Sequence, residues 1–129
     1  MNAKEMIKYY YPYSGLDWLN YKIKDMEYFS DLTYHHIVPR RLHSKKDINN
    51  GALLTSVSHQ YLHLIEKIEI ATFDDLNKIL KDINTQKREP YQYQREDIEN
   101  LFEEFEKRHK WEKNKEGKIL VKKKYLKRW

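Results

Sequence analysis

The chain has 129 residues, 40% of them hydrophobic and 35% charged, with a formal net charge of +5. This length fits one domain with a modest core, and no apolar run approaches the roughly 20 residues that span a bilayer. The absence of cysteine excludes a disulfide framework, thiolate chemistry and cysteine-based metal sites. The N-terminal stretch MNAKEMIKYYYPYSG lacks the apolar core of a signal peptide, so we expect a cytoplasmic location.

The first third of the chain predicts one short helix and one strand. Residues 3–11 favour a helix that ends before Pro12, whereas residues 16–29 carry apolar residues at mixed spacing, so both helix and strand stay open there. Four of the eleven tyrosines fall within residues 9–13; they could stack on bases, but such a cluster is more often core. LTYHHIV is rich in β-formers and precedes Pro39, which predicts a strand over residues 32–38.

The remainder of the chain predicts one more strand and then helices. A polar loop over residues 40–50 precedes GALLT, a second strand, after which Ser56 or Ser58 can cap a helix. Thr72 and Asp75 resemble the capping pair of a second helix, and residues 95–110 form a third. The expected apolar faces of these last two helices consist of Phe73, Leu76, Ile79, Leu80 and Ile83, and of Ile98, Leu101, Phe102 and Phe105.

Positive charge is concentrated at the C-terminus. Residues 111–129 contain eight Lys or Arg and two Glu, a net of +6 against +5 for the whole chain, so residues 1–110 net to −1. A basic segment of this kind, including Lys122, Lys123 and Lys124, is typical of contact with nucleic-acid phosphates. A solvated tail that aids solubility explains the charge equally well.

Five of the six histidines lie between residues 35 and 63, and four of them fall on the predicted first strand and the helix that follows the second. His35 and His36 are adjacent in the first predicted strand, so their rings point to opposite faces. His59 and His63 are four residues apart on a predicted helix, where two imidazoles can share one metal ion. Whichever of His35 and His36 faces the helix can supply a third ligand, and the other suits general-base work at neutral pH. Buried strand histidines, and packing alone for His63, are the alternatives.

The order HHIVP, then Asn50, then His59 nine residues later resembles the HNH endonucleases, the ββα-metal or His-Me finger family. The wider stretch over residues 31–69 is similar to small HNH proteins of Gram-positive phages and mobile elements. The resemblance implies that His35 is a metal ligand and His36 the general base. It further implies that Asn50 holds the hairpin loop, that His59 is the second ligand, and that His63 matches a further helical ligand of the bacteriocin branch.

The same resemblance implies an α+β fold: a ββα-metal finger, a short two-stranded hairpin plus helix, surrounded by additional helices and helix-rich overall. We expect a single HNH domain over residues 1–110, with its core at about 31–70 and a helical extension over 72–110, followed by a basic tail over 111–129. The chain departs from the family in its loop, LHSKKD, and in having Thr55 and Ser58 where a zinc-binding cysteine pair usually falls.

The function implied is metal-dependent hydrolysis of DNA phosphodiester bonds, with one divalent ion. Mg or Mn would support cleavage, while Zn or Ni would bind a histidine site more tightly. Arg40 and Arg41 could clamp phosphates, and Glu66 could accept a hydrogen bond from a ligand imidazole. Cleavage of both strands would favour a homodimer. The alternative is a catalytically silent protein of a phage or mobile element that binds nucleic acid or inhibits a host defence system.

Overall fold

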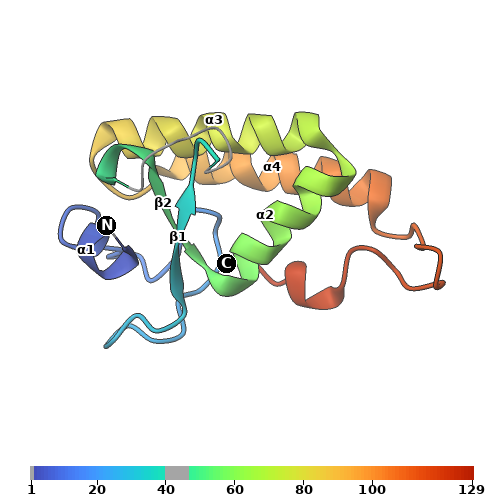
Figure 1. Ribbon diagram of the computed structural model, residues 1–129, viewed down its shortest axis with the longest axis horizontal. Helices are drawn as coiled ribbons and strands as arrows, with labels where there is room; N and C mark the ends of the chain where they lie inside the picture. Colours follow the sequence, from blue (N-terminus) through green and yellow to red (C-terminus); the bar gives the residue numbers. More distant parts are fainter. Residues whose placement is uncertain (1, 40–46) are drawn as a thin grey trace.

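The computed structural model describes residues 2–39 and 47–129 and shows an α+β chain in which a two-stranded hairpin is followed by helices (Figure 1). Its elements in chain order are α1 (Ala3–Ile7), β1 (Leu32–His36), the 3-10 turn η2 (Ile48–Asn50), β2 (Gly51–Thr55), α2 (Ser56–Ile68), α3 (Ile70–Gln86), α4 (Gln92–His109) and the 3-10 turn η3 (Lys123–Tyr125). None of these helices is long and apolar enough to cross a membrane.

The hairpin pairs β1 and β2 antiparallel, in a register that runs from Leu32 opposite Thr55 to His36 opposite Gly51. The prediction of a strand at GALLT is confirmed, whereas β1 ends at His36, two residues earlier than predicted. Beyond the strand, the backbone N–H of Ile37 still donates to the carbonyl of Asn50 in η2, at 2.9 Å. The partner chain is no longer extended there, because Ile48–Asn50 form a 3-10 turn.

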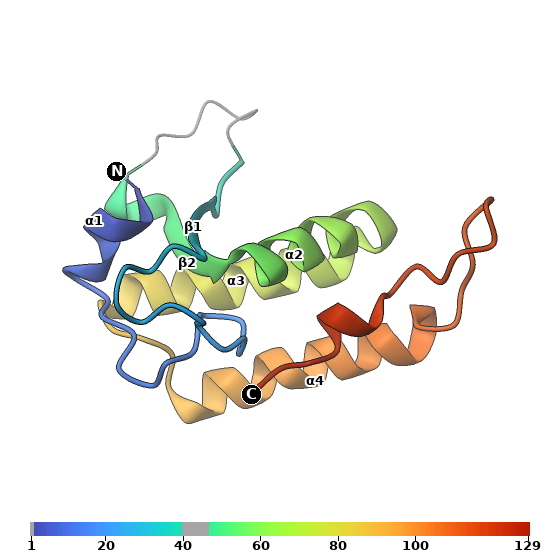
Figure 2. The ribbon, with the colours of Figure 1, turned by 90° about the horizontal axis from the view of Figure 1, so that it is seen from below.

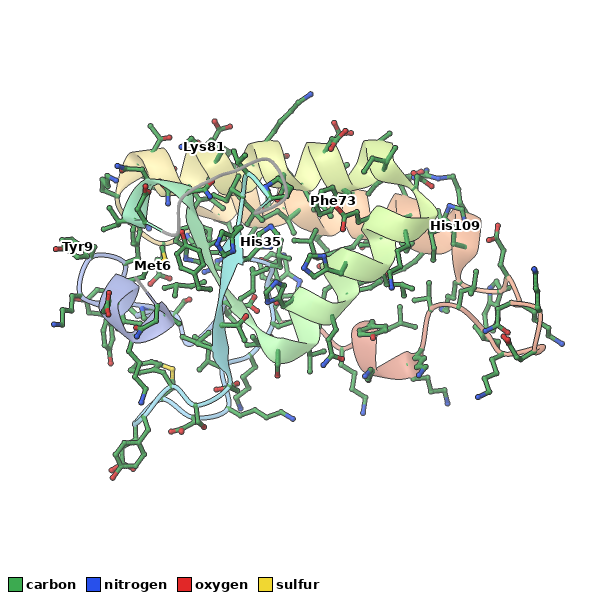
Figure 3. All side chains as sticks on the ribbon, in the orientation of Figure 1. Met6, Tyr9, His35, Phe73, Lys81 and His109 are labelled. Atoms are coloured by element: carbon green, nitrogen blue, oxygen red, sulfur yellow. The ribbon has the colours of Figure 1, made fainter. Side chains whose placement is uncertain are left out.

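Gly51, at the start of β2, lies where two neighbouring side chains leave no room for a Cβ atom. A Cβ atom on Gly51 would lie 2.3 Å from the Tyr34 ring and 2.6 Å from the Met6 sulfur. Met6 comes from α1, so the missing side chain lets α1 and β1 pack directly against β2. Figure 3 shows Met6 on this side of the hairpin, with His35 near the centre of the molecule.

Helices α3 and α4 bury the apolar faces that the sequence predicts, but the caps or first residues of α2, α3 and α4 differ from the predicted ones. Thr55, rather than Ser56 or Ser58, caps α2, because its hydroxyl accepts a hydrogen bond from the Ser58 N–H. α3 begins at Ile70, so the predicted Thr72 cap is wrong: Thr72 lies inside the helix and its hydroxyl donates to Glu69. α4 begins at Gln92, three residues before the predicted start. The buried faces of α3 and α4 hold Phe73, Leu76, Leu80, Ile83, Ile98, Phe102 and Phe105.

The N-terminal region is more irregular than predicted. α1 ends at Ile7, and residues 16–29 form turns with one isolated bridge, Leu16 to Lys22, so neither helix nor strand is correct there. Of the clustered tyrosines only Tyr10 is core; its hydroxyl donates to the Asn84 carbonyl at 2.6 Å. The other three, Tyr9, Tyr11 and Tyr13, are exposed, so the expectation of a core cluster fails for them.

The Asp17 carboxylate joins this irregular region to the hairpin. It is fully buried and accepts hydrogen bonds from Leu19 N (2.8 Å), Tyr21 N (3.0 Å), Thr55 N (2.7 Å) and the Ser58 hydroxyl (2.5 Å). Burial raises the pKa of the Asp17 carboxyl, and the four hydrogen bonds oppose that shift. Thr55 and Ser58 stand where a cysteine pair was expected by resemblance, so a carboxylate here connects the end of β2 to the start of α2.

The C-terminal segment folds back onto the helices. Val121 and Tyr125 are buried, and the Tyr125 ring stacks on Tyr61 of α2 at 4.8 Å between centroids. Arg128 pairs with Glu99 and Glu106 of α4 at 2.7 and 2.8 Å. Figure 2 shows this segment, in dark red, running along α4. Residues 121–129 are therefore packed against the domain, in contrast to the solvated tail considered for them.

Candidate metal centre

Three histidines converge between β1 and α2. His35 projects from β1, and His59 and His63 lie one turn apart on α2, with ligand nitrogens that all lie within 4.8 Å of one another. The ring centroids are 5.2 Å apart for His35 and His59 and 4.9 Å apart for His59 and His63. His35 is buried, His59 is half-buried and His63 is exposed, so the cluster is open to solvent on one side. These three histidines could hold a metal ion.

The tautomer of His35 follows from its partner on α3. Its Nε2 lies 3.0 Å from Asn77 Oδ1, and the amide nitrogen of Asn77 donates to the Ile37 carbonyl at 3.3 Å. Because the Asn77 amide is oriented by that second bond, its oxygen accepts from His35 and the proton must reside on Nε2. The Nδ1 lone pair of His35 is therefore the one available to an ion.

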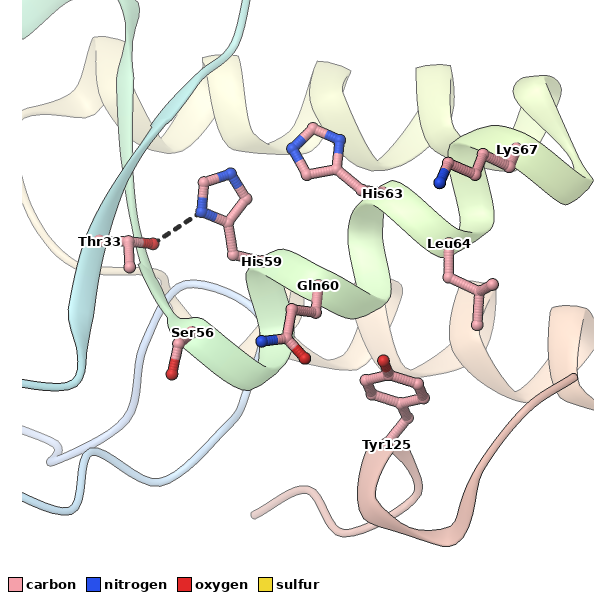
Figure 4. Close-up of a pocket in the computed structure, with 8 residues that line it drawn as sticks. All are labelled: Thr33, Ser56, His59, Gln60, His63, Leu64, Lys67 and Tyr125. Carbon is pink, nitrogen blue, oxygen red and sulfur yellow. Dashed lines mark hydrogen bonds between the residues drawn. The ribbon is translucent and has the colours of Figure 1, made fainter.

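The same reasoning assigns the two histidines of α2. The Thr33 hydroxyl donates its one proton to the Leu54 carbonyl at 2.8 Å, so it must accept from His59 Nδ1, also at 2.8 Å (Figure 4). His63 Nδ1 lies 3.2 Å from the Glu66 carboxylate, which can only accept when ionised. Both rings therefore leave Nε2 for an ion, and Glu66 occupies the role predicted for it beside His63.

The donor set fits a divalent ion. Neutral imidazoles are the form that binds metal, and burial lowers the pKa of His35 to about 3 and that of His59 to about 4. Two nitrogens on one Zn²⁺ lie at most about 4 Å apart, twice the Zn–N distance, and one nitrogen from each of the three rings already lies within 4.8 Å of the others. Three imidazoles suit Zn²⁺, Ni²⁺ or Co²⁺ better than Mg²⁺.

His36 lies beside this cluster without joining it. It lines the same pocket of about 280 Å³ as the three histidines, together with Glu66 and Phe73. Its ring packs edge-on against Tyr34, at 5.0 Å between centroids. Tyr34 and His36 share one face of β1, whereas Thr33 and His35 share the other, which is the alternation expected of a strand. The two adjacent histidines therefore have different surroundings within one pocket.

Asn50 joins the end of β1 to the beginning of β2. Its side-chain oxygen accepts from Val38 N at 2.8 Å and its amide donates to the Val38 carbonyl at 3.1 Å. This pair of hydrogen bonds holds the two sides of the hairpin loop together. Asn50 thus lies where the resemblance implied, in a position that supports the loop.

The remaining predicted site residues are two arginines and three lysines. Arg40 and Arg41 lie outside the described residues. Lys122, Lys123 and Lys124 are exposed at η3. Sequence reasoning missed Thr33 and Asn77: the first could have been found from its place two residues before His35 on the same strand face, but no pattern marks Asn77, which reaches the site through the packing of α3.

Comparisons with protein-family models, with curated proteins and with solved structures return no match for this chain.

Asn77 offers a test of the proposed tautomer. Replacing it with leucine removes the acceptor for His35 Nε2, so we expect Zn²⁺ or Ni²⁺ affinity to fall about 10- to 100-fold, as for other lost partners of metal-bound histidines. Asn77→Asp keeps an acceptor oxygen and should bind metal nearly as well as the wild type. Isothermal titration calorimetry measures both. Equal affinities for the two variants would contradict the role of Asn77.

Acidification should destabilise the metal-free protein through His35 and His59. Their folded pKa values of about 3 and about 4 lie below the ordinary value of 6.5. As pH falls below about 6.5, these two histidines take up protons in the unfolded chain but stay neutral in the folded protein. The free energy of unfolding then decreases by about 1.4 kcal/mol per pH unit for each histidine that is protonated only in the unfolded chain. Urea denaturation in EDTA between neutral pH and pH 5 measures the slope, which His35→Gln should reduce.

Proposed function

We propose that this protein is a metal-dependent endonuclease of the HNH type that hydrolyses phosphodiester bonds in DNA. The observation that supports this most strongly is the different placement of two adjacent histidines at the end of β1. His35 belongs to a three-histidine cluster, and its neighbour His36 lines the same pocket from the other strand face. A purely structural metal site does not require a fourth imidazole beside it.

The layout of the elements supports the same proposal. A hairpin whose loop is supported by Asn50 leads directly into α2, and His59 is the fourth residue of that helix. This order of strand, loop, strand and helix matches the ββα-metal finger that HHIVP, Asn50 and His59 resemble. α3 then packs against the hairpin and α2 and supplies Asn77 to His35.

In the proposed reaction His35, His59 and His63 would hold one divalent ion. When bound, the ion supplies Lewis-acid stabilisation of negative charge on the phosphate and on the leaving 3′ oxygen. His36 accepts a proton from a water placed in line with the scissile bond. Attack of that water on phosphorus breaks the bond to the 3′ oxygen, which gives a 5′-phosphate and a 3′-hydroxyl. Asn50 supports the hairpin beside the ion through its two hydrogen bonds to Val38, and Arg40 and Arg41 are the residues that the sequence suggests as phosphate contacts.

Incubation of supercoiled plasmid with the purified protein tests the proposal. We expect open-circular and then linear DNA with Mn²⁺, Mg²⁺ or Ni²⁺, and no conversion with EDTA. Products with 5′-phosphates should be ligatable without prior phosphorylation, which distinguishes the proposed chemistry from a contaminant that leaves 3′-phosphates. Intact plasmid with all three ions would contradict the endonuclease proposal.

A further inference from the structure

A second hollow adjoins the metal centre along α2 and is called here the α2 groove. It has a volume of about 570 Å³ and lies between the start of β1, one face of α2 and η3. Its lining includes Thr33, Gln60, Lys67 and Tyr125, and it shares His59 and His63 with the metal centre. Figure 4 shows both imidazoles at the upper edge of this groove and Tyr125 at its lower edge. A molecule bound along the groove would therefore also contact two of the three clustered histidines, His59 and His63.

The charge of the α2 groove is positive. Lys67 of α2 is exposed and lines the groove. Lys124 of η3 extends toward α2, where its Nζ lies 3.2 Å from Oε1 of Gln60, another lining residue. Among the described residues that line the groove, none is acidic. The nearest carboxylate on α2, Glu66, faces the neighbouring pocket and is bonded to His63. An extended anion is the ligand that such a surface favours.

The wall that carries Lys124, η3, is held in place by buried residues. Tyr125 of η3 is buried and stacks on Tyr61, whose own ring stacks on Phe102 at 5.2 Å. Three residues later the Arg128 guanidinium bonds both Glu99 and Glu106, and the side chain is only 3% exposed. Anchoring on both sides of Leu126 fixes η3 against α2 and α4. The backbone that carries Lys124 therefore needs no ordering when a ligand binds.

We propose that the α2 groove binds one strand of a nucleic acid next to the metal centre, with Lys67 and Lys124 contacting its phosphates. The C-terminal segment would then act as a fixed wall of the binding site, and its charge would position the strand rather than attract DNA at random. This inference rests on the proposed function, because it is the shared histidines that link the groove to a scissile phosphate.

Two double variants with the same change in charge test the proposal. Lys67→Gln/Lys124→Gln removes both charges from the groove, whereas Lys115→Gln/Lys118→Gln removes two exposed charges from the turn at residues 112–120, the orange-red loop at the right of Figure 1. Fluorescence anisotropy with a labelled short duplex and with a labelled single strand, in EDTA, measures binding without cleavage. We expect the groove variant to bind about tenfold more weakly and its salt slope to fall by about two.

The control variant should change affinity less than about twofold, because its charges lie away from the groove. Equal losses in the two variants would show a diffuse charge effect and overturn the proposal. Absence of binding by the intact protein to DNA or RNA at low salt would also overturn it, and would point to an acidic protein surface as the occupant. Weaker binding by the groove variant, without plasmid cleavage by the intact protein, would support the groove and contradict only the endonuclease proposal.

Discussion

Replacement of His36 with alanine is expected to abolish plasmid cleavage while metal binding is retained. His36 lines the pocket of the three-histidine cluster but is not one of its three members. Loss of a general base costs about 10²- to 10⁴-fold in rate, whereas ligand nitrogens on His35, His59 and His63 are untouched. The initial rate of nicking with Mn²⁺ and the Ni²⁺ affinity by calorimetry measure the two effects separately.

The neighbouring residue provides the matched control. His35→Gln removes a ligand from the same strand, so it should weaken both Ni²⁺ binding and cleavage. Added imidazole should restore part of the activity of His36→Ala, because the deleted ring leaves space in the pocket, and should not restore His35→Gln. Cleavage by His36→Ala at the wild-type rate would show that His36 is not the base. Loss of Ni²⁺ binding in the same variant would show that it is a ligand.

Asp17→Ala is expected to have the largest effect on stability. The carboxylate accepts four hydrogen bonds, and three of the donors are backbone N–H groups of Leu19, Tyr21 and Thr55. Alanine leaves these buried donors without their acceptor, at a cost of about 3–5 kcal/mol. That is a large part of the 5–15 kcal/mol that typically stabilises a domain. Asp17→Asn keeps one acceptor oxygen, so it should lie between the wild type and alanine.

Asp25 is a suitable control because its carboxylate also accepts hydrogen bonds from four donors, on Glu27, Tyr28 and Ser30, but at the surface. Water can replace Asp25 as the partner of those donors, so Asp25→Ala should be much less destabilising. Urea denaturation, followed by circular dichroism, gives the unfolding midpoints. Similar midpoints for Asp17→Ala and Asp25→Ala would contradict the proposed importance of burial at Asp17.

The elements with a strong local signal could be predicted from the sequence. GALLT is a strand, and the apolar spacing of α3 and α4 correctly identifies their buried faces, because periodicity records which side of an element meets the core. The cluster of His35, His59 and His63 was predictable in part. Helical spacing placed His59 and His63 on one side of α2, and strand alternation required one of His35 and His36 to face them, but only the family resemblance implied that this one is His35.

Local patterns failed where contacts distant in the sequence decide the structure. Residues 16–29 have no clear period, because their backbone is held by the Asp17 carboxylate, by Arg95 of α4 and by β2 rather than by a regular ladder. The C-terminal lysines were equally consistent with nucleic-acid contact and with a solvated tail, since charge alone does not show that Tyr125 and Arg128 anchor the segment.

The sequence by itself determined which residue types could form a metal centre and which elements would hold them, because side-chain direction follows from strand and helix periodicity. Only the tertiary structure decided which nitrogen of His35 and of His59 is available. Asn77 of α3 orients the first ring, and Thr33 of β1, itself bonded to Leu54 of β2, orients the second. The tertiary structure also decided that η3 lies beside the metal centre as the wall of a groove. Such contacts depend on how helices pack, and packing is set by the shape of the whole core rather than by any local pattern.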